Sequence, residues 1–474
     1  MVQKIALVDV GTWNPGFYGR VSSVDPLGIE YLGASLVREG HDVELFQKRR
    51  TLEELINKIV GTDSEVIGIS SLTCDIYNAF KVAEAMKTKN KKIKTIIGGY
   101  HATALPSESL KNDSIDFVVL GEGENPLLRL VNALSEGKTT FDDFSNLGWK
   151  TEDGDIKINK RDFSDVSDIQ QWPLRKKEFL EGNKLYGVGY PPISHHKAAL
   201  ITYSRNCPHK CRYCASPWLF GRRVRHRDPQ DVINEMVRLR DAHGVNLFYF
   251  TDLTFNINRK KTEELCNVLK GKDLNWYAMC SIDNKNIDEE LIVLMKEAGM
   301  TKILFGLESF SKNVLKAYDR TIKEDRAKYF NDSLRLLDKH GLGTRCTYMI
   351  GEINETESDL KTYPDLFKQI LPDEMSIKIV TPFPGTPLFD EYENKGLLLH
   401  KQWDKYDTDH LVFRHPSLSE KTLKRYRYET TKQYFESDEY KNHVKQKIKD
   451  HPYLTQSFID YLGRLKTRGI NVNI

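Results

Sequence analysis

The chain has 474 residues, too long for one ordinary hydrophobic core, which predicts roughly two to four domains. Hydrophobic residues make up 39% and charged residues 29%, which excludes a disordered or fibrous protein. The net charge of +3 is too small to indicate a nucleic-acid partner. No apolar run is long enough to predict a membrane span, and the start, MVQKIALVDVG, lacks the features of a secretory signal. We therefore expect a cytoplasmic protein whose seven cysteines form no disulfide framework.

The first 145 residues alternate short apolar runs, such as residues 4–11, with helical patterns, such as residues 31–41. This alternation predicts βαβ units, a parallel sheet and right-handed crossovers. Ligands of such sheets bind beyond the carboxyl ends of the strands, where this chain has the polar stretches DVG, SSLT, GGYHAT and GEGEN. We predict an α/β domain over residues 1–145 with a doubly wound, flavodoxin- or Rossmann-like parallel sheet.

Residues 146–196 have a different pattern, with a predicted hairpin around Glu-Asp-Gly and a Gly/Pro-rich stretch, YGVGYPPISHHK. We interpret them as a linker. A second series of strands and helices starts at residue 198 and gives about six βα units, fewer than a closed eight-fold barrel needs. We predict a partial barrel over residues 197–396 and a helical region over residues 397–474.

The stretch NCPHKCRYCASP places Cys207, Cys211 and Cys214 close together in the chain. Three thiolates cannot all pair as disulfides, but they can share a metal. Structural zinc usually takes four protein ligands, and no fourth cysteine is nearby. A [4Fe–4S] cluster is also normally held by four thiolates, so three would leave one iron with an open site. An open iron can bind a substrate directly and pass it one electron.

The spacing C-x3-C-x2-C follows a predicted strand and carries the aromatic Tyr213 just before the last cysteine. In these features the chain resembles the radical S-adenosylmethionine (SAM) superfamily. The resemblance implies a partial (β/α)6 barrel, a [4Fe–4S] cluster on the three cysteines, and SAM chelating the open iron. It further implies reductive cleavage of SAM to methionine and a 5′-deoxyadenosyl radical, which abstracts hydrogen from a small-molecule substrate. An electron donor such as flavodoxin or ferredoxin is the implied partner, and Tyr213 is an expected cofactor-binding residue.

Two further segments resemble elements of this superfamily. In FTDLTF, Asp252 stands where the family has an acidic group facing the ammonium of SAM, a favourable pairing in a dry site. The subfamily usually has two adjacent acids here, whereas this chain has Leu253 next, and a capping or strand-end role for Asp252 is the alternative. In FGLESF, the resemblance implies that Glu308 and Ser309 reach the ribose or carboxylate of SAM.

The first domain resembles the cobalamin (B12)-binding-type domain of one branch of radical SAM enzymes, through PLGIEYLGASLVREGHDV, ISSLT, GGYHAT and GEGE. The resemblance implies that Ser70, Ser71 and Leu72, and the pair Gly98 and Gly99, line the nucleotide loop of cobalamin. Small residues there allow a large ligand to approach the backbone. Cobalamin proteins that bind the cofactor through a lower-face histidine ligand carry the motif D-x-H-x-x-G after the first strand. This motif is incomplete here, with Gly11 in the histidine position and Asn14 in the glycine position. A degenerate domain that only packs on the barrel is therefore the alternative to cobalamin binding.

These features lead to one expected function and two alternatives. We expect a radical SAM enzyme that removes hydrogen from an unactivated carbon, with cobalamin-dependent C-methylation of a small molecule, in which a second SAM restores methylcobalamin. The first alternative is a non-methylating radical reaction, namely a dehydration, epimerisation, ring contraction or cyclisation, with a vestigial cobalamin domain. The second is a non-catalytic regulator that binds cobalamin or an iron–sulfur cluster, against which the complete cysteine motif argues.

Overall fold

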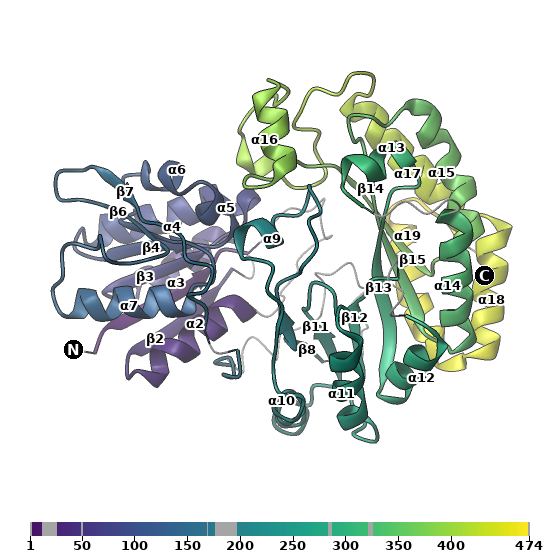
Figure 1. The fold of residues 1–474 in the computed structure, drawn as a ribbon, viewed down its shortest axis with the longest axis horizontal. Coiled ribbons are helices and arrows are strands. Elements are labelled where there is room, and N and C mark those ends of the chain that lie inside the picture. Colours follow the sequence, from purple (N-terminus) through teal and green to yellow (C-terminus); the bar gives the residue numbers. More distant parts are fainter. Residues whose placement is uncertain are drawn as a thin grey trace.

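The computed structural model describes residues 2–11, 26–48, 51–167, 169–175, 197–282, 287–320 and 326–472. Two sheets stand side by side, the N-terminal sheet at the left of Figure 1 and the second sheet at the centre and right. The C-terminal helices lie beyond the second sheet (Figure 1). The position of Asn14 and the predicted connector over residues 186–196 lie outside the described residues.

The N-terminal sheet confirms the predicted doubly wound fold. Five parallel strands lie in the order β2-β1-β3-β4-β5, with β2 at one edge. This strand order is the flavodoxin-like one. The strands are β1 (Lys4–Asp9), β2 (Asp42–Gln47), β3 (Val66–Ser70), β4 (Lys94–Gly98) and β5 (Phe117–Val119).

Helices cover both faces of this sheet because side chains of a strand alternate between faces. On β1, Ala6 and Val8 pack into one buried cluster, and Ile5 and Leu7 pack into another. The helical elements of this domain are α2 (Leu27–Arg38), α3 (Leu52–Val60), η1 (Thr73–Asp75), α4 (Ile76–Lys89), α5 (Tyr100–Ala104), α6 (Pro106–Leu110) and α7 (Glu124–Ser135).

The hairpin expected within the linker is present, but it belongs to the N-terminal sheet. Its strands are β6 (Leu147–Lys150) and β7 (Ile156–Ile158), and β6 pairs antiparallel with β5. Trp149 on β6 is buried against the same cluster as Phe117 on β5. The sheet thus extends to residue 158, past the boundary at 145 that composition suggested.

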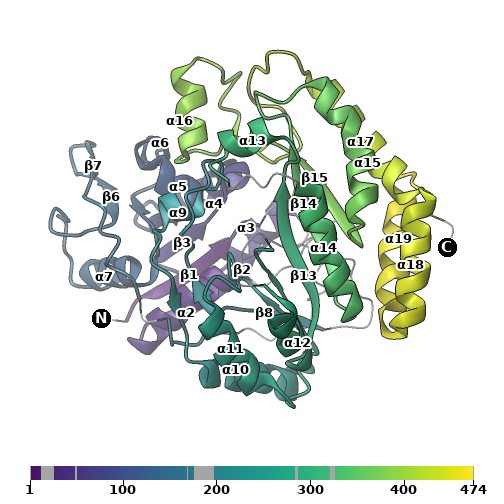
Figure 2. The ribbon, with the colours of Figure 1, turned by 45° about the vertical axis from the view of Figure 1, so that its right-hand side comes forward.

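The second sheet is the predicted partial barrel. Its six strands are all parallel and lie in the order β15-β14-β13-β12-β11-β8. These strands are β8 (Ala198–Ile201), β11 (Leu247–Phe250), β12 (Trp276–Met279), β13 (Met300–Glu308), β14 (Gly343–Ile350) and β15 (Glu374–Ile379). The helices that follow the strands lie outside the curved sheet (Figure 2). They are α10 (Pro229–His243), α11 (Arg259–Leu269), α12 (Glu289–Glu297), α13 (Lys312–Ala317), α14 (Arg326–Lys339) and α15 (Glu357–Ile370).

Short elements and C-terminal helices complete the chain. The short elements are β9 (Ser204–Arg205), α9 (Ser216–Leu219), β10 (Arg225–His226), α16 (Pro387–Asn394), η2 (Trp403–Lys405) and η3 (Pro452–Leu454). The C-terminal helices are α17 (Glu420–Phe435), α18 (Asp438–Asp450) and α19 (Thr455–Thr467), and α17 packs against α15 and β15. None of the helices in the described ranges combines the length and apolarity that crossing a membrane requires.

The lumen of the partial barrel is open to solvent towards the carboxyl ends of β13, β14 and β15. Outward-facing side chains of these strands, such as Phe305, Tyr348 and Ile379, are buried in the main core. Inward-facing residues on the same strands are partly exposed, and these are Gly306, Glu308, Thr347, Met349, Ser376 and Lys378. A ligand therefore has access to this face of the sheet.

Candidate active site

The three clustered cysteines lie in the loop between β9 and α9, beyond the carboxyl end of β8, the first barrel strand. Cys207 and Cys211 are buried, Cys214 is partly buried, and all three are reduced. Arg320 donates a hydrogen bond to Cys211 Sγ at 3.6 Å, and Thr254 Oγ1 lies 3.9 Å from Cys207 Sγ. The loop thus presents three thiols together with a guanidinium that favours a negatively charged group.

The donor set of this loop fits an iron–sulfur cluster. Structural zinc usually takes four protein ligands. Three thiols with no fourth cysteine nearby in the chain suit a [4Fe–4S] cluster, in which one iron then keeps an open site.

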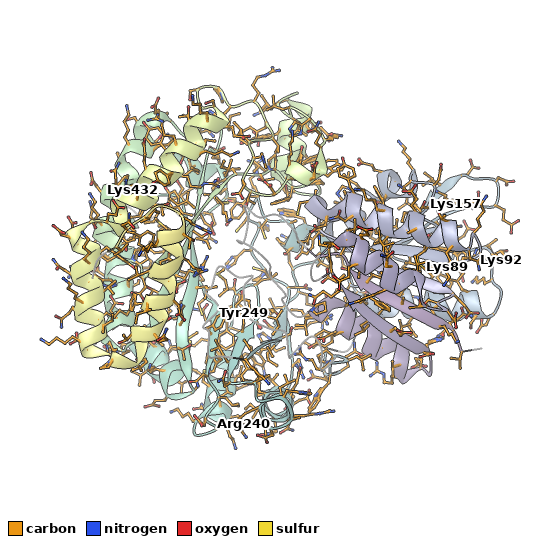
Figure 3. The ribbon with its side chains drawn as sticks, turned by 180° about the vertical axis from the view of Figure 1, so that it is seen from behind. Lys89, Lys92, Lys157, Arg240, Tyr249 and Lys432 are labelled. Carbon is orange, nitrogen blue, oxygen red and sulfur yellow. The ribbon has the colours of Figure 1, made fainter. Side chains whose placement is uncertain are left out.

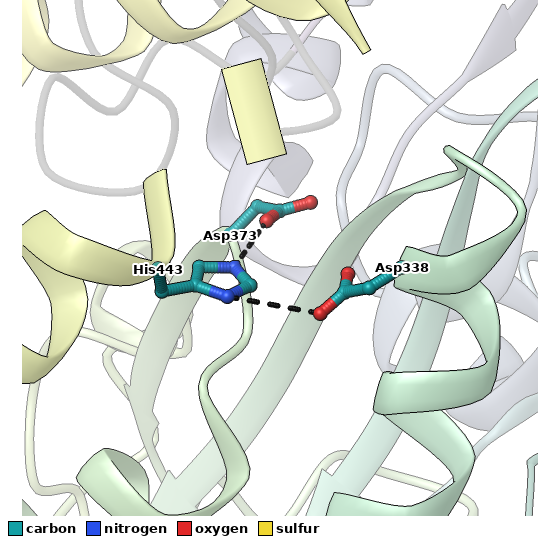
Figure 4. A group of neighbouring side chains, drawn as sticks. All are labelled: Asp338, Asp373 and His443. Carbon is teal, nitrogen blue, oxygen red and sulfur yellow. Dashed lines mark hydrogen bonds and ion pairs between the residues drawn. The ribbon is translucent and has the colours of Figure 1, made fainter. Parts of the chain in front are cut away.

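The group of Asp338, Asp373 and His443 is an ion-pair network (Figure 4). His443 Nε2 lies 2.8 Å from Asp373 Oδ1, and its Nδ1 lies 3.7 Å from Asp338 Oδ2. The Lys447 ammonium pairs with both carboxylates, at 2.6 Å from Asp373 Oδ2. Because this ammonium already supplies the cation, the network holds α18 against α14 and the start of β15.

Asp252 connects the end of β11 to the start of the cysteine loop. Its carboxylate accepts hydrogen bonds from the backbone N–H groups of Tyr203 at 3.0 Å and Ser204 at 2.6 Å, and from the Ser204 hydroxyl at 2.5 Å. Burial raises the pKa of Asp252 to about 6, against the lowering effect of these hydrogen bonds. These contacts match the strand-end role. A contact with the ammonium of SAM remains a prediction.

Glu308 and Ser309 differ in their access to the lumen. Glu308 is partly exposed and adopts φ +64°, and its carboxyl folds back over Gly306, where any Cβ would clash with it. Ser309 is fully buried, and its hydroxyl accepts a hydrogen bond from the backbone N–H of Ser311 at 3.0 Å. Ser309 thus shapes the turn after β13, and its contact with SAM stays a prediction.

Tyr213 stands with its ring edge-on to Tyr318 at 4.8 Å. Because Tyr318 is fully buried, this contact packs Tyr213 against the protein interior beside the cysteine loop. This contact shows how the aromatic position supports the loop. A contact of Tyr213 with a cofactor remains a prediction.

A cavity of about 640 Å³ lies between the two domains. The residues expected to bind cobalamin all line it, and these are Ser70, Leu72, Gly98 and Gly99. The barrel contributes residues from the ends of β8 and β11, and these are Thr202, Ser204, Arg205, Asn206, Thr251 and Leu253. The carboxyl ends of both parallel sheets therefore open into one cavity, as expected for ligand sites of such sheets.

The walls of this cavity fit a large ligand with polar groups. Gly99 has φ +100°, and a Cβ there would lie 2.5 Å from the carbonyl oxygen of Ser71, so only glycine fits. The Ser71 hydroxyl is buried and has no hydrogen-bond partner among the described residues. A buried polar group of this kind costs free energy unless a ligand or water satisfies it. Ser70, Ser71, Leu72, Gly98 and Gly99 would thus hold cobalamin.

Salt bridges join the two domains beside this cavity. Arg205 of β9 pairs with Glu124 at 2.7 Å and with Glu122 at 3.2 Å, and Arg225 of β10 also pairs with Glu122. Burial alone would lower the pKa of Arg205, but Glu124 and Glu122 outweigh burial and raise it. Glu122 and Glu124 therefore both lie at the interface between the domains.

The sequence-based site omitted Arg205, which stands two residues before the first cysteine. The stretch Ser70-Ser71-Leu72 was expected at the nucleotide loop, and the structure adds that the buried Ser71 hydroxyl has no partner among the described residues. Trp403 belongs to the core, since its ring is buried and its indole N–H donates to Glu108 Oε1 at 2.5 Å.

Comparison with known proteins agrees with this geometry. The model of the B12 binding domain matches residues 20–131, and that of the radical SAM superfamily matches residues 201–366. An uncharacterized methyltransferase of Pyrococcus horikoshii is 30% identical over 389 residues, which cover 81% of this chain and 82% of that protein. An anaerobic magnesium-protoporphyrin IX monomethyl ester cyclase of Rubrivivax gelatinosus is 28% identical over 78% of this chain and 66% of its own length.

One solved structure shares the fold over nearly the whole chain. It is the cobalamin-dependent SAM radical enzyme OxsB with aqua-cobalamin and SAM bound, with a TM-score of 0.70 and 13% identity over 99% of this chain and 76% of that one. Each family match falls on one of the two sheets, with β2 to β5 inside residues 20–131 and β11 to β14 inside residues 201–366. The Pyrococcus relative aligns over most of both chains. The chain therefore belongs to the radical SAM superfamily, among the members that carry a B12-binding domain before the barrel.

Proposed function

We propose that this enzyme uses radical SAM chemistry to methylate a carbon atom of a small molecule, with cobalamin as the methyl carrier. One observation carries the proposal: a single cavity is lined both by the carboxyl ends of β1, β3 and β4 and by the ends of β8 and β11. A ligand held by the first domain thus faces the barrel next to the cysteine loop. The methyltransferase relative supports the same reaction class.

The residues have distinct parts in this proposal. Cys207, Cys211 and Cys214 would hold the cluster, and Asp252 positions the loop that carries them. When bound, the [4Fe–4S] cluster supplies a low-potential electron for the cleavage of SAM, and cobalamin supplies a methyl group. In balance, one substrate C–H bond, two SAM molecules and two electrons give one C–CH3 group, methionine, 5′-deoxyadenosine and S-adenosylhomocysteine.

The electrons require a donor, and we expect a low-potential carrier such as flavodoxin or ferredoxin in the cytoplasm. Exposed cationic side chains flank the cysteine loop, and these are Lys210, Arg222 and Arg223. A cationic rim favours encounter with an acidic carrier and makes the rate of reduction sensitive to salt.

The test uses protein reconstituted anaerobically with iron and sulfide and supplied with reductant, SAM and hydroxocobalamin. Retained cobalamin, together with formation of both 5′-deoxyadenosine and S-adenosylhomocysteine, is the expected result. The cyclase relative favours the non-methylating alternative. Formation of 5′-deoxyadenosine alone, with no cobalamin retained after gel filtration, would establish that alternative and exclude the methyltransferase.

A further inference from the structure

We propose that Tyr100 is a positioning residue that couples the cysteine loop to the cobalamin-binding residues, through a hydrogen bond between its hydroxyl and that of Ser216. A protein that holds the iron–sulfur cluster should then bind cobalamin more tightly than a protein without it. The proposal rests on the proposed function, since it requires that the chain bind both groups, but it does not depend on methyl transfer.

The contact joins the two domains at the cavity between them. Tyr100 Oη lies 2.9 Å from Ser216 Oγ, so the two hydroxyls share a hydrogen bond. Tyr100 begins α5 of the N-terminal domain, and Ser216 begins α9, the helix that follows the cysteine loop. Both residues line the cavity, and the Tyr100 ring packs edge-on against Phe220 with the ring centroids 4.8 Å apart. The two helices lie side by side in Figures 1 and 2.

On the barrel side, Ser216 belongs to one hydrogen-bonded unit with the cysteines. The backbone N–H of Cys214 donates to the Cys211 carbonyl at 3.2 Å, and the indole N–H of Trp218 donates to the same carbonyl at 3.2 Å. Ser216 stands two residues after Cys214, and its own carbonyl accepts the backbone N–H of Phe220 at 2.9 Å. A cluster that fixes Cys211 and Cys214 would therefore also restrain Ser216.

On the other side, Tyr100 directly follows the glycine pair expected to hold cobalamin. The carbonyl of Gly99 accepts the backbone N–H of Thr103 at 3.0 Å, so Gly99 moves together with the first turn of α5. Gly99 also lies so close to the Ser71 carbonyl that no Cβ fits between them. The position of α5 therefore sets the shape of the wall formed by Gly98, Gly99 and Ser71.

A third segment packs against both helices. A Cβ on Gly385, in the loop after β15, would lie 2.6 Å from the Leu219 side chain of α9 and 3.1 Å from the Ala104 side chain of α5. This segment is also tied to the cysteine loop, because the backbone N–H of Leu388 donates to the Arg212 carbonyl at 3.1 Å. The hydrogen bond between the helices thus lies within a packed junction, where a restraint on one helix reaches the other.

The expected effect on cobalamin follows from conformational entropy. A bound cluster would restrain the cysteine loop, and the hydrogen bond between Ser216 and Tyr100 would pass this restraint to α5. Cobalamin then meets residues that are already ordered, so less conformational entropy is lost when it binds. A hydrogen bond has a net strength that changes a binding constant by about threefold to tenfold.

The test is a titration of the full chain with hydroxocobalamin, in which ultrafiltration separates free from bound cobalamin. Two forms are compared, one reconstituted with iron and sulfide and one iron-free with reduced cysteines. We expect the reconstituted form to bind about threefold to tenfold tighter. Tyr100→Phe keeps the ring but removes the hydroxyl, so the ratio of the two dissociation constants should fall toward one. A purely structural role would weaken both forms alike and leave this ratio unchanged.

Further variants assign the effect to this hydrogen bond. Ser216→Ala should lower the ratio as Tyr100→Phe does, and the double variant should lower it no further, because both hydroxyls act through one contact. Tyr77→Phe is the matched control: the Tyr77 hydroxyl donates to the Lys401 carbonyl at 3.3 Å and so also joins the N-terminal domain to the C-terminal region. This control should keep the wild-type ratio. The melting temperature of each variant checks its fold.

Amide hydrogen exchange gives a second readout that needs no cobalamin. Reconstitution of the cluster should slow exchange in α5 of the wild type and leave it unchanged in Tyr100→Phe. The segment around Lys92 serves as the internal reference, because it lies at the outer edge of the N-terminal domain, away from the barrel (Figure 3).

Two results would overturn the proposal while leaving the proposed function standing. One is equal dissociation constants for the two forms of the wild type, and the other is an unchanged ratio in Tyr100→Phe. In both cases cobalamin still binds, but Tyr100 does not couple its binding to the cluster. A wild-type protein that binds no cobalamin in either form would overturn the proposed function together with this inference.

Discussion

Ser204 donates two hydrogen bonds to Asp252, one from its backbone N–H at 2.6 Å and one from its hydroxyl at 2.5 Å. This contact links two adjacent parallel strands at the point where the cysteine loop begins. The geometry of the loop thus depends on a carboxylate from the next strand. This contact fixes how the loop presents three thiols that are close in the chain.

Asp252→Asn should reduce the iron and sulfide that the protein retains after reconstitution. The amide has one acceptor oxygen, and its NH2 group would face a backbone N–H donor, which costs about 1–3 kcal/mol. Iron and sulfide assays on the purified variant measure the effect. Asp241→Asn is the control, because Asp241 is exposed and remote from the loop. Unchanged iron retention in Asp252→Asn would contradict the positioning role.

Gly99→Ala should abolish retention of cobalamin. The new Cβ would lie 2.5 Å from the Ser71 carbonyl oxygen, at a backbone φ of +100°. Gly137→Ala is a matched control, since Gly137 also has positive φ (+77°) but no atom lies within 4 Å of the position that its Cβ would take. The visible absorbance of protein after gel filtration with hydroxocobalamin gives the readout. Equal retention in the two variants would show that close approach at Gly99 is unimportant.

Ser71→Ala should weaken cobalamin binding several-fold without lowering the stability of the cofactor-free protein. The hydroxyl is buried without a partner in the described structure, so its removal costs no internal hydrogen bond. Ser109→Ala should instead lower the stability of the protein and leave cobalamin binding unchanged. Its buried hydroxyl donates to the Leu105 carbonyl at 3.0 Å, and the loss of this hydrogen bond costs about 1 kcal/mol. Urea denaturation and cobalamin titration separate the two effects.

Lys447→Met should lower the free energy of unfolding by about 3–5 kcal/mol, because it leaves the buried Asp373 and the half-buried Asp338 without their shared cation. EDTA should leave the wild-type melting temperature unchanged, since the ammonium occupies the position a metal would take. A drop in melting temperature on chelation, restored by a divalent cation, would instead indicate a metal at this network.

Glu355→Gln should become increasingly stable relative to the wild type as the pH rises from about 4.5 to 8. Burial raises the pKa of Glu355 to about 8, against hydrogen bonds from Tyr363 and Gly351. A carboxyl whose pKa is raised by folding stabilises the protein fully below its unfolded pKa and loses that contribution as pH rises through the folded pKa, by up to about 1.4 kcal/mol per unit. Urea denaturation across this range measures the difference.

Glu357→Gln is the control for the pH experiment. Glu357 is exposed, and the hydrogen bond from Tyr426 lowers its pKa, so its substitution should show no such gain with rising pH. A flat difference between Glu355→Gln and the wild type would mean that Glu355 ionises normally in the folded protein.

The amino-acid sequence by itself determined both sheets and the cysteine loop. Short apolar runs, separated by helical patterns, specify strands and helices locally, and the alternation leads to parallel sheets. The spacing of Cys207, Cys211 and Cys214 likewise depends only on neighbours in the chain. These features are encoded in short segments, and they could be predicted for that reason.

Only the tertiary structure decided which polar residues are accessible at the site. The motif predicts the same role for the adjacent residues Glu308 and Ser309. The turn after β13 nevertheless exposes Glu308 to the lumen and buries Ser309. The hairpin of β6 and β7 joined the first sheet because β5 offered an open edge. Arg205 and Glu122 are 83 residues apart in the sequence and form an ion pair. The packing of the two domains, rather than any local pattern, forms this pair and the shared cavity.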